Sequence, residues 1–317
     1  MAKAAFQKGL SAFPHPERVN YALQRFVTHK LPPNEERLRR KFARGLNHLK
    51  AYERYGPSRP FSNAALYEFG AGWDLAIPLT FWMLGADHQL LVDIRPNLHL
   101  ALVNVNLERL ARLAPEFEQE SGRTLRAPDP VPVRSHEELE ERFGIRYRAP
   151  WDSRRTGLEP GSVDLVSSTV TLEHVPRDDV APLLRECRRL LRPDGVLSAL
   201  IDLSDHYSQI DTSINRYNFL RYSDRAWGLI NSSLQHQNRM RHPDYRAAFE
   251  EAGLEIVWEK SRTASNEHLD ALRELDVAER FRVYAFDQLA VVRMRVVARP
   301  KGNASPDRFE EHEDVGG

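Results

Sequence analysis

The residues best suited to bind a ligand lie in a short turn that follows an apolar run early in the chain. The run reads AALYEFGAGWD and places an acid, Glu68, just before the glycine pair Gly70 and Gly72. Glycine lacks a β-carbon, so the backbone can bend sharply there and a ligand can approach its N–H groups. A strand, such a turn and then a helix place those groups at the carboxyl edge of a sheet, where nucleotides bind. The pattern therefore predicts a nucleotide-binding turn.

The residues after Gly72 discriminate between two kinds of nucleotide. A dinucleotide site has the pattern G-x-G-x-x-G/A, and this chain has Leu75 at the third small position, with Asp74 before it. A carboxylate at Asp74 would repel a pyrophosphate. Together with Glu68 it would instead favour a nucleoside joined to a cationic amino acid, and S-adenosylmethionine is such a cofactor.

The next apolar run supplies a group for the sugar of the nucleoside. It reads LLVDI and ends in Asp93, 25 positions after Glu68. A carboxylate there can accept hydrogen bonds from both ribose hydroxyls, and an NAD enzyme would use it in the same way. The alternative interpretation of Asp93 is a helix N-cap.

Alternating apolar runs and amphipathic segments predict the elements that hold these residues. Seven strands are expected, in the runs AALYEF, HQLLVDI, GIRYRA, SVDLVSSTVT, VLSALIDLS, EIVWEKSR and QLAVVRMRVVA. Near-continuous apolar strands separated by helices indicate a mostly parallel sheet that is covered on both faces. The fold class is therefore α/β. We expect helices over residues 97–113, 178–191 and 266–281, and a turn at RPDG, residues 192–195.

Composition divides the chain into three parts. Residues 1–60 look helical, residues 61–300 form the α/β domain, and the polar, acidic residues 301–317 are expected to be a disordered tail. Residues 205–242 form an insertion after strand five that is rich in Tyr, Asn, Ser, His and Arg, and we expect a cap rather than a core layer.

Charge and cysteine content exclude several classes of protein. The 45 basic residues balance the 45 acidic residues among 317, which argues against general nucleic-acid or membrane-surface binding. Cys187 is the single cysteine and lies in a helical pattern, so no internal disulfide can form. No apolar run approaches 18 residues and no secretory segment is recognisable, which predicts a cytoplasmic protein. The oligomeric state is left open.

Four stretches in order resemble the class I S-adenosylmethionine-dependent methyltransferases. YEFGAGWD resembles the acid-x-G-x-G motif of that family, and LLVDI resembles its ribose-binding strand end. APWD followed by GSVDLVSSTVTLEHV resembles the adenine-side loop and fourth strand, and LLRECRRLLRPDGVLSALID the helix, turn and strand after it. The resemblance covers residues 60–205. It implies a seven-stranded Rossmann-like methyltransferase sheet with helices on both faces.

The resemblance also implies roles for individual residues. Glu68, Gly70 and Gly72 would hold the methionine end of S-adenosylmethionine, and Asp93 its ribose. Asp152 would accept from the adenine amino group with Trp151 beside the ring; otherwise Asp152 caps a turn and Trp151 covers a core edge. S-adenosylhomocysteine would be the product.

Methyl transfer to a hydroxyl needs a base at the ends of strands four and five. The run DLSDHYS supplies His206, whose intrinsic pKa lies near neutrality and which Asp205 could orient. His174, in LEHV, is a second candidate, although that run could serve only for shape. One alternative is a surface role for His206. Another is a divalent metal held by Asp202, Asp205 and His206; no metal site is assigned, and metal dependence is left open.

The cap should supply the acceptor pocket. Its aromatic rings and guanidinium groups suit a polar acceptor, with an acidic group or a sugar. The candidates are Tyr207, Arg216, Tyr217, Arg221, Tyr222 and Trp227. The sequence thus predicts O-methylation of a polar small molecule or glycan. The rival hypotheses are an NAD(P)-dependent oxidoreductase and a non-catalytic methyltransferase-like protein that binds a partner through its cap.

Overall fold

The structure is a computed structural model that describes residues 31–209, 211, 213–231 and 236–302. The predictions for residues 1–30 and for the tail beyond residue 302 lie outside these ranges. Within the described residues, no helix is long and apolar enough to cross a membrane.

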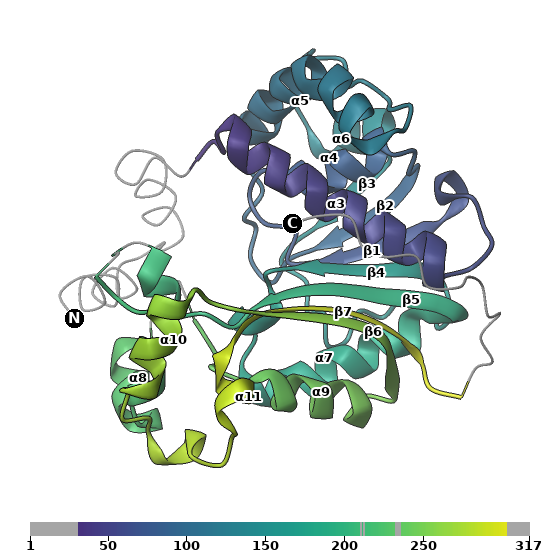
Figure 1. The fold of residues 1–317 in the computed structure, drawn as a ribbon. Coiled ribbons are helices and arrows are strands. Elements are labelled where there is room, and N and C mark those ends of the chain that lie inside the picture. Colours follow the sequence, from purple (N-terminus) through teal and green to yellow (C-terminus); the bar gives the residue numbers. More distant parts are fainter. Residues whose placement is uncertain (1–30, 210, 212, 232–235, 303–317) are drawn as a thin grey trace.

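A seven-stranded sheet runs through the centre of the molecule (Figure 1). The strands are β1 (Ala65–Phe69), β2 (His88–Val92), β3 (Ile145–Arg148), β4 (Val163–Thr169), β5 (Leu191–Asp202), β6 (Leu254–Thr263) and β7 (Val291–Pro300). Their order is β3-β2-β1-β4-β5-β7-β6. β1 to β5 pair in parallel, and β7 is antiparallel to both β5 and β6. The predicted mostly parallel, seven-stranded α/β fold is confirmed.

Helices cover both faces of this sheet (Figure 1). One face carries α3 (Glu35–Tyr55), α4 (Ala76–Met83), α5 (Leu100–Ser121) and, at its edge, α6 (His136–Phe143). The other face carries α7 (Arg177–Leu190) and α9 (His242–Glu251). Short helices make up the remainder: α8 (Asp224–Ile230), α10 (Asn266–Arg273), α11 (Phe286–Ala290), η2 (Phe61–Asn63), η3 (Leu172–His174), η4 (His206–Gln209), η5 (Asn218–Arg221) and η6 (Glu279–Phe281).

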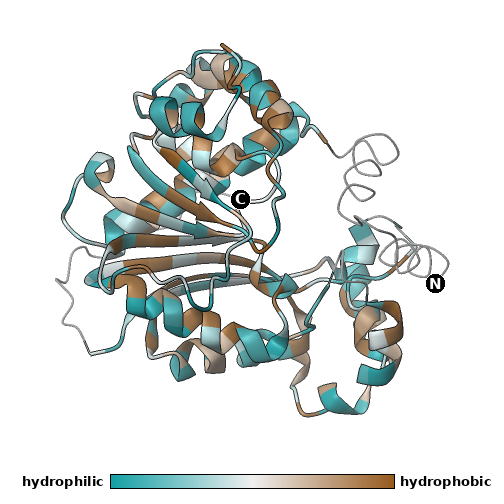
Figure 2. Ribbon diagram, turned by 180° about the vertical axis from the view of Figure 1, so that it is seen from behind, coloured by the Kyte–Doolittle hydropathy of each residue, from teal (hydrophilic) through white to brown (hydrophobic). Residues whose placement is uncertain are grey.

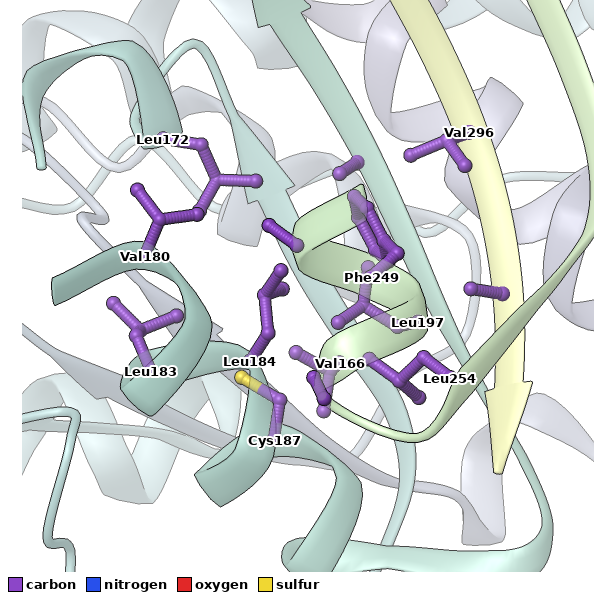
Figure 3. Packing of buried hydrophobic residues seen from close by; sticks show 14 of the residues in the cluster. Val166, Leu172, Val180, Leu183, Leu184, Cys187, Leu197, Phe249, Leu254 and Val296 are labelled. Atoms are coloured by element: carbon purple, nitrogen blue, oxygen red, sulfur yellow. The ribbon is translucent and has the colours of Figure 1, made fainter. Parts of the chain in front are cut away.

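Apolar side chains fill the space between the sheet and the helices on each face. Figure 2 shows that the hydrophobic colour gathers in the central strands, while much of the outer helix surface is hydrophilic. Under α7 and α9, Leu184, Cys187 and Phe249 pack against the strands (Figure 3). Burial raises the pKa of the Cys187 thiol, which disfavours the reactive thiolate. On the opposite face, the rings of Phe42 and Phe117 stack with their centroids 4.0 Å apart.

Three predicted element boundaries differ from the structure. α5 continues past Pro115 to Ser121, and Phe117 in this extra part stacks on α3. Residues 192–195 are not a free turn, because they lie inside β5, where the pairing with β4 changes register. The helix predicted over residues 266–281 ends at Arg273 and gives way to irregular chain.

The cap was predicted to be too polar for a core, and this was wrong. The structure buries Tyr217, Phe219 and Trp227 of the cap in one cluster with apolar side chains from residues 272–292. Trp227 packs edge-on against Phe219, with ring centroids 5.9 Å apart. The aromatic residues that made the segment look suited to a ligand therefore form a second, smaller core beside the main sheet.

Candidate functional site

The glycine turn after β1 has two positions that only glycine fits well. Gly70 and Gly72 have φ angles of 74° and 76°, a region that L-residues rarely adopt. A β-carbon on Gly70 would lie 2.3 Å from the side chain of Thr171, whereas one on Gly72 would meet nothing within 4 Å. Gly70 thus allows the turn to pack against the end of β4. Gly72 faces open space into which a ligand can fit.

Asp93 follows β2 and points its carboxylate at the same turn. Its Oδ2 accepts hydrogen bonds from the Gly72 N–H at 3.2 Å and from the Tyr147 hydroxyl at 3.3 Å. Among the described residues, no donor occupies Oδ1, so this oxygen can still accept from a ligand hydroxyl. Burial raises the pKa of Asp93 to about 7. The geometry fits the predicted ribose-binding role.

Glu68, within β1, is a second buried carboxyl beside the turn. Ser167 on β4 donates to Glu68 Oε2 at 3.4 Å, and burial raises the pKa of Glu68 to about 8. The nearby Asp93 acts in the same direction. A cationic group that entered the turn would stabilise the ionised forms of both. The two carboxyls therefore fit a cofactor with a nucleoside at one end and an ammonium group at the other.

Asp74 does not belong to this set, and the role that we predicted for it was wrong. Its carboxylate is buried and accepts from Lys41 Nζ at 2.7 and 2.6 Å. It also accepts from the N–H of Ala76 at 3.0 Å, at the start of α4. Since Lys41 neutralises this charge, Asp74 neither attracts a cationic cofactor nor repels a pyrophosphate.

The loop after β3 holds the two residues expected at the adenine. The Trp151 N–H donates to the main-chain oxygen of Asp93 at 2.9 Å, which brings this loop beside the ribose carboxylate. The Asp152 carboxylate is held by Arg154, with Nε–Oδ1 and Nη2–Oδ2 distances of 2.9 Å. Sequence reasoning missed Ile94, which is 68% exposed. In the sequence, Ile94 stands directly after Asp93, the predicted ribose acid. Its exposed side chain offers an apolar surface for the adenine ring.

A cavity of about 540 Å³ opens at the ends of β4 and β5, where the acceptor pocket was expected. Its walls come from α3, the ends of β4 and β5, the start of the cap, α10 and β7. The lining residues are Arg44, Val170, His174, Asp202, Ser204, His206, Ser208, Gln209, Ile214, Arg216, His268 and Arg293. The structure thus brings His174, His206 and Arg216 together, as predicted for a site above the sheet.

One strained residue joins the cavity to the glycine turn. Val170 lines the cavity and has a φ angle of 56°, which is unusual for a β-branched residue. The next residue, Thr171, is the one whose side chain leaves no room for a β-carbon on Gly70. The turn and the cavity therefore share the short segment of chain that follows β4.

His206 is buried in the cavity wall, but its neighbours differ from those we expected. Its Nε2 lies 3.8 Å from Asp202 Oδ2 and 3.9 Å from Glu173 Oε1. Asp205, predicted to orient it, accepts from the Tyr207 N–H at 2.9 Å and from Asn218 Nδ2 at 3.4 Å instead. The carboxyls that face the imidazole are therefore Asp202 and Glu173. The burial of its carboxylate at the start of the cap raises the pKa of Asp205 to about 6.

Glu173 is the residue of the site that sequence reasoning passed over, although it stands in the LEHV run. It is buried, and its Oε1 accepts from the N–H of Asp202 at 3.3 Å. Burial, followed by repulsion from Asp202, holds the pKa of Glu173 well above its usual range. The adjacent His174 has its pKa lowered by burial, and its ring centroid lies 5.0 Å from that of His206.

The same side chains could hold a metal ion. Glu173, His174 and His206 offer ligand atoms that all lie within 4.8 Å of one another. This set differs from the predicted alternative of Asp202, Asp205 and His206, because Asp205 turns towards the cap.

Most of the predicted substrate residues of the cap lie away from the cavity. Tyr217 is buried, and its hydroxyl donates to the main-chain oxygen of Ala290 at 2.6 Å. Tyr207 belongs to the core of the cap, where its hydroxyl donates to the oxygen of Ile230 at 3.3 Å. The ring of Tyr222 stacks on Trp227, and the guanidinium of Arg221 lies over the Tyr222 ring, 5.9 Å from its centroid. Arg216 remains as the member of the predicted set that lines the cavity.

Comparisons with known proteins agree with the fold. Residues 134–199 match the family model described as a methyltransferase domain. The strand order differs from the dinucleotide-binding order 3-2-1-4-5-6, because an antiparallel β7 lies between β5 and β6. This chain is therefore similar to a methyltransferase domain over residues 134–199.

Individual relatives are distant. The search of curated proteins finds no match. A provisionally named sarcosine dimethylglycine methyltransferase from Galdieria sulphuraria is 16% identical over 83% of this chain and 86% of that chain, with a TM-score of 0.44. The geranyl diphosphate C-methyltransferase of Streptomyces coelicolor A3(2) is 11% identical over 86% of both chains, with a TM-score of 0.44. The 1,6-didemethyltoxoflavin-N1-methyltransferase of Burkholderia thailandensis is 14% identical over 90% of this chain and 87% of that chain, with a TM-score of 0.45.

Proposed function

We propose that this protein is an S-adenosylmethionine-dependent methyltransferase that methylates a hydroxyl group of a polar small molecule or glycan, with His206 as the general base. The observation that carries the proposal is the position of His206 in the wall of the cavity, beside Asp202 and Glu173. A volume of about 540 Å³ suits a small molecule. The acceptor would enter between the cap and the ends of β4 and β5.

The cofactor would bind in the glycine turn. Asp93 would accept from the ribose hydroxyls, and Glu68 lies where it can act on the ammonium end. The adenine ring would lie beside Ile94 and Trp151. S-adenosylmethionine supplies an electrophilic methyl group on a sulfonium centre.

The protein residues would prepare the nucleophile. His206 would take the proton from the acceptor hydroxyl, and the Asp202 carboxylate, with Oδ2 3.8 Å from the imidazole Nε2, would stabilise the resulting imidazolium. The Asp202 carboxylate is itself fixed by Ser204, whose N–H and hydroxyl donate to Oδ1 at 3.0 and 2.5 Å. Asp202 thus takes the orienting role that the sequence had suggested for Asp205.

The test compares His206→Ala with the control His88→Ala. His88 is exposed and begins β2, at the end of the strand away from Asp93. Turnover is measured as S-adenosylhomocysteine formation, on whichever catechol, sugar or hydroxy acid the wild type methylates. His206→Ala should lower turnover by roughly 10²- to 10⁴-fold while the affinity for S-adenosylhomocysteine stays the same. His88→Ala should match the wild type. Normal turnover in His206→Ala would remove His206 from the mechanism.

The geometry of Glu173, His174 and His206 makes a metal the second candidate for activating the hydroxyl. Treatment with EDTA distinguishes the two. A general base is insensitive to the chelator. A loss of turnover that added Mg²⁺ or Mn²⁺ restores would assign the three side chains to a metal instead.

A further inference from the structure

Buried arginines elsewhere in this fold are surrounded by acceptors. Arg241 is fully buried, and it donates to the main-chain oxygens of Leu203, Leu289 and Val291 at 2.5–2.8 Å. Arg239 donates to two carbonyl oxygens of the cap and forms an ion pair with Asp224 at 2.8 Å. Such bonds compensate the cost of taking a guanidinium out of water.

Two arginines in the cavity wall lack this compensation. Arg44 on α3 and Arg293 on β7 are both half-buried, and neither forms a hydrogen bond or an ion pair with any residue that the structure describes. They also act on each other, because burial and then the charge of Arg293 lower the pKa of Arg44. Two like charges thus face one cavity from different elements.

The acids of the cavity balance these charges only in part. Asp202 supplies one negative charge, which acts on Arg44, but its oxygens accept from Ser204 on Oδ1 and from Gln209 Nε2 on Oδ2 at 3.4 Å and form no ion pair with either arginine. Glu173 is buried, and its Oε1 accepts from the N–H of Asp202 at 3.3 Å rather than from an arginine. A third arginine, Arg216, enters the wall from the cap. The cavity therefore has an excess of positive charge and unused donors.

We propose that the methyl acceptor is an anion whose carboxylate or phosphate group binds between Arg44 and Arg293, with Arg216 at the same group from the cap. This rests on the proposed function, since it names the substrate class for the same cavity. Guanidinium groups present paired N–H donors that match both oxyanions. An anion held there would fix the acceptor in the cavity that also contains His206, so its hydroxyl is presented to the base.

The stability of the arginine variants distinguishes a binding role of the two arginines from a structural one. A structural arginine stabilises the fold, and its removal lowers the melting temperature. An arginine held without an acceptor costs stability in the free protein, because its desolvation is not offset. The Arg44→Gln and Arg293→Gln proteins should therefore melt at the same temperature as the wild type, or higher.

The experiment titrates inorganic phosphate and benzoate separately into the full-length protein by calorimetry at low ionic strength. At least one of the two should bind, and Arg44→Gln and Arg293→Gln should each weaken that binding by 10-fold or more. The matched control is Arg40→Gln, which removes an exposed arginine of α3 paired with Glu36. It should bind the anion as the wild type does. The anion that binds more tightly identifies the acidic group.

Binding of S-adenosylhomocysteine, measured on the same samples, separates this proposal from the proposed function. If S-adenosylhomocysteine binds and neither anion does, the anionic acceptor is ruled out while the methyltransferase assignment stands. Equal anion affinity in wild type, Arg44→Gln and Arg293→Gln would also overturn it. A lower melting temperature in both variants with unchanged anion binding would make the arginines structural. Anion binding without S-adenosylhomocysteine binding would leave the arginine site intact and contradict the proposed function.

Discussion

Replacing Asp93 with asparagine should strengthen the fold and weaken cofactor binding, two effects of opposite direction. Asparagine keeps the shape of the side chain, and its oxygen can still accept from Gly72 and Tyr147. What is lost is the charge. In the wild type, burial raises the pKa of Asp93 from 3.8 to about 7.

The sign of the stability effect follows from that direction. A carboxyl whose pKa is raised by folding stabilises the native state fully below pH 3.8, and this contribution is lost as the pH rises to about 7. At about 1.36 kcal/mol for each pKa unit, the loss above pH 7 is on the order of 4 kcal/mol at most. Asparagine does not titrate, so Asp93→Asn should be more stable than the wild type by about 1–4 kcal/mol at pH 8, and the difference should shrink towards pH 4.

The effect on the cofactor follows from the two hydrogen bonds expected to the ribose. Hydrogen bonds to a charged acceptor contribute about 1.5–3 kcal/mol and those to a neutral one about 0.5–1.5 kcal/mol, so two of them lose about 2–3 kcal/mol. S-adenosylhomocysteine should then bind roughly 30- to 150-fold more weakly.

The assays are urea denaturation at several pH values and calorimetric titration with S-adenosylhomocysteine. Asp87→Asn is the matched control, because Asp87 precedes the same strand at its other end and pairs with Arg126. It should change neither the cofactor affinity nor the pH dependence of stability. The reasoning is refuted if Asp93→Asn binds S-adenosylhomocysteine as tightly as the wild type, or if it is the less stable protein at pH 8.

Two further predictions concern the glycine turn and the ion pair between Lys41 and Asp74. Gly72→Ala should weaken S-adenosylhomocysteine binding by 10-fold or more, and the positive φ should cost about 1–2 kcal/mol of stability. Gly122 at the end of α5 also has a positive φ and open surroundings, so Gly122→Ala should cost similar stability and leave the affinity unchanged. Equal affinities in the two variants would show that Gly72 does not face the ligand. Lys41→Met should destabilise the protein by about 1–3 kcal/mol in urea denaturation, because it leaves the buried Asp74 without its cation, whereas Lys50→Met on the exposed side of α3 should have no effect. A fully stable Lys41→Met would mean that the ion pair is not needed.

The sequence predicts well what local patterns determine. The apolar runs give all seven strands, and the glycine pair gives a turn with two positive φ angles. Asp93 follows its strand as expected and points at the turn. These features depend on a few neighbouring residues, so they can be recognised without knowledge of the tertiary fold.

What depends on distant partners could not be predicted in the same way. Asp74 looked free for a ligand because its cation, Lys41, lies on a helix 33 positions earlier in the chain. Asp202 and Asp205 could both orient His206 by spacing, and only the tertiary structure shows that Asp205 turns towards Asn218. The aromatic residues of the cap suggested a ligand site because the apolar segment they pack against lies beyond residue 270.

That Arg44 and Arg293 lie in one cavity could not be predicted from the sequence either. Arg44 lies on the N-terminal helix α3 and Arg293 on the last strand, β7, and neither belongs to a motif. Their pairing in one wall results from α3 crossing the sheet near the antiparallel β7 (Figure 1).

The most direct measurement of the central claim is a calorimetric titration of the full-length protein with S-adenosylhomocysteine, with NAD⁺ titrated in parallel. The account predicts one molecule of S-adenosylhomocysteine bound per chain, roughly 30- to 150-fold weaker binding in Asp93→Asn, and no heat from NAD⁺. Binding of NAD⁺ without S-adenosylhomocysteine would favour an oxidoreductase, and binding of neither would favour a non-catalytic protein; either result contradicts the account.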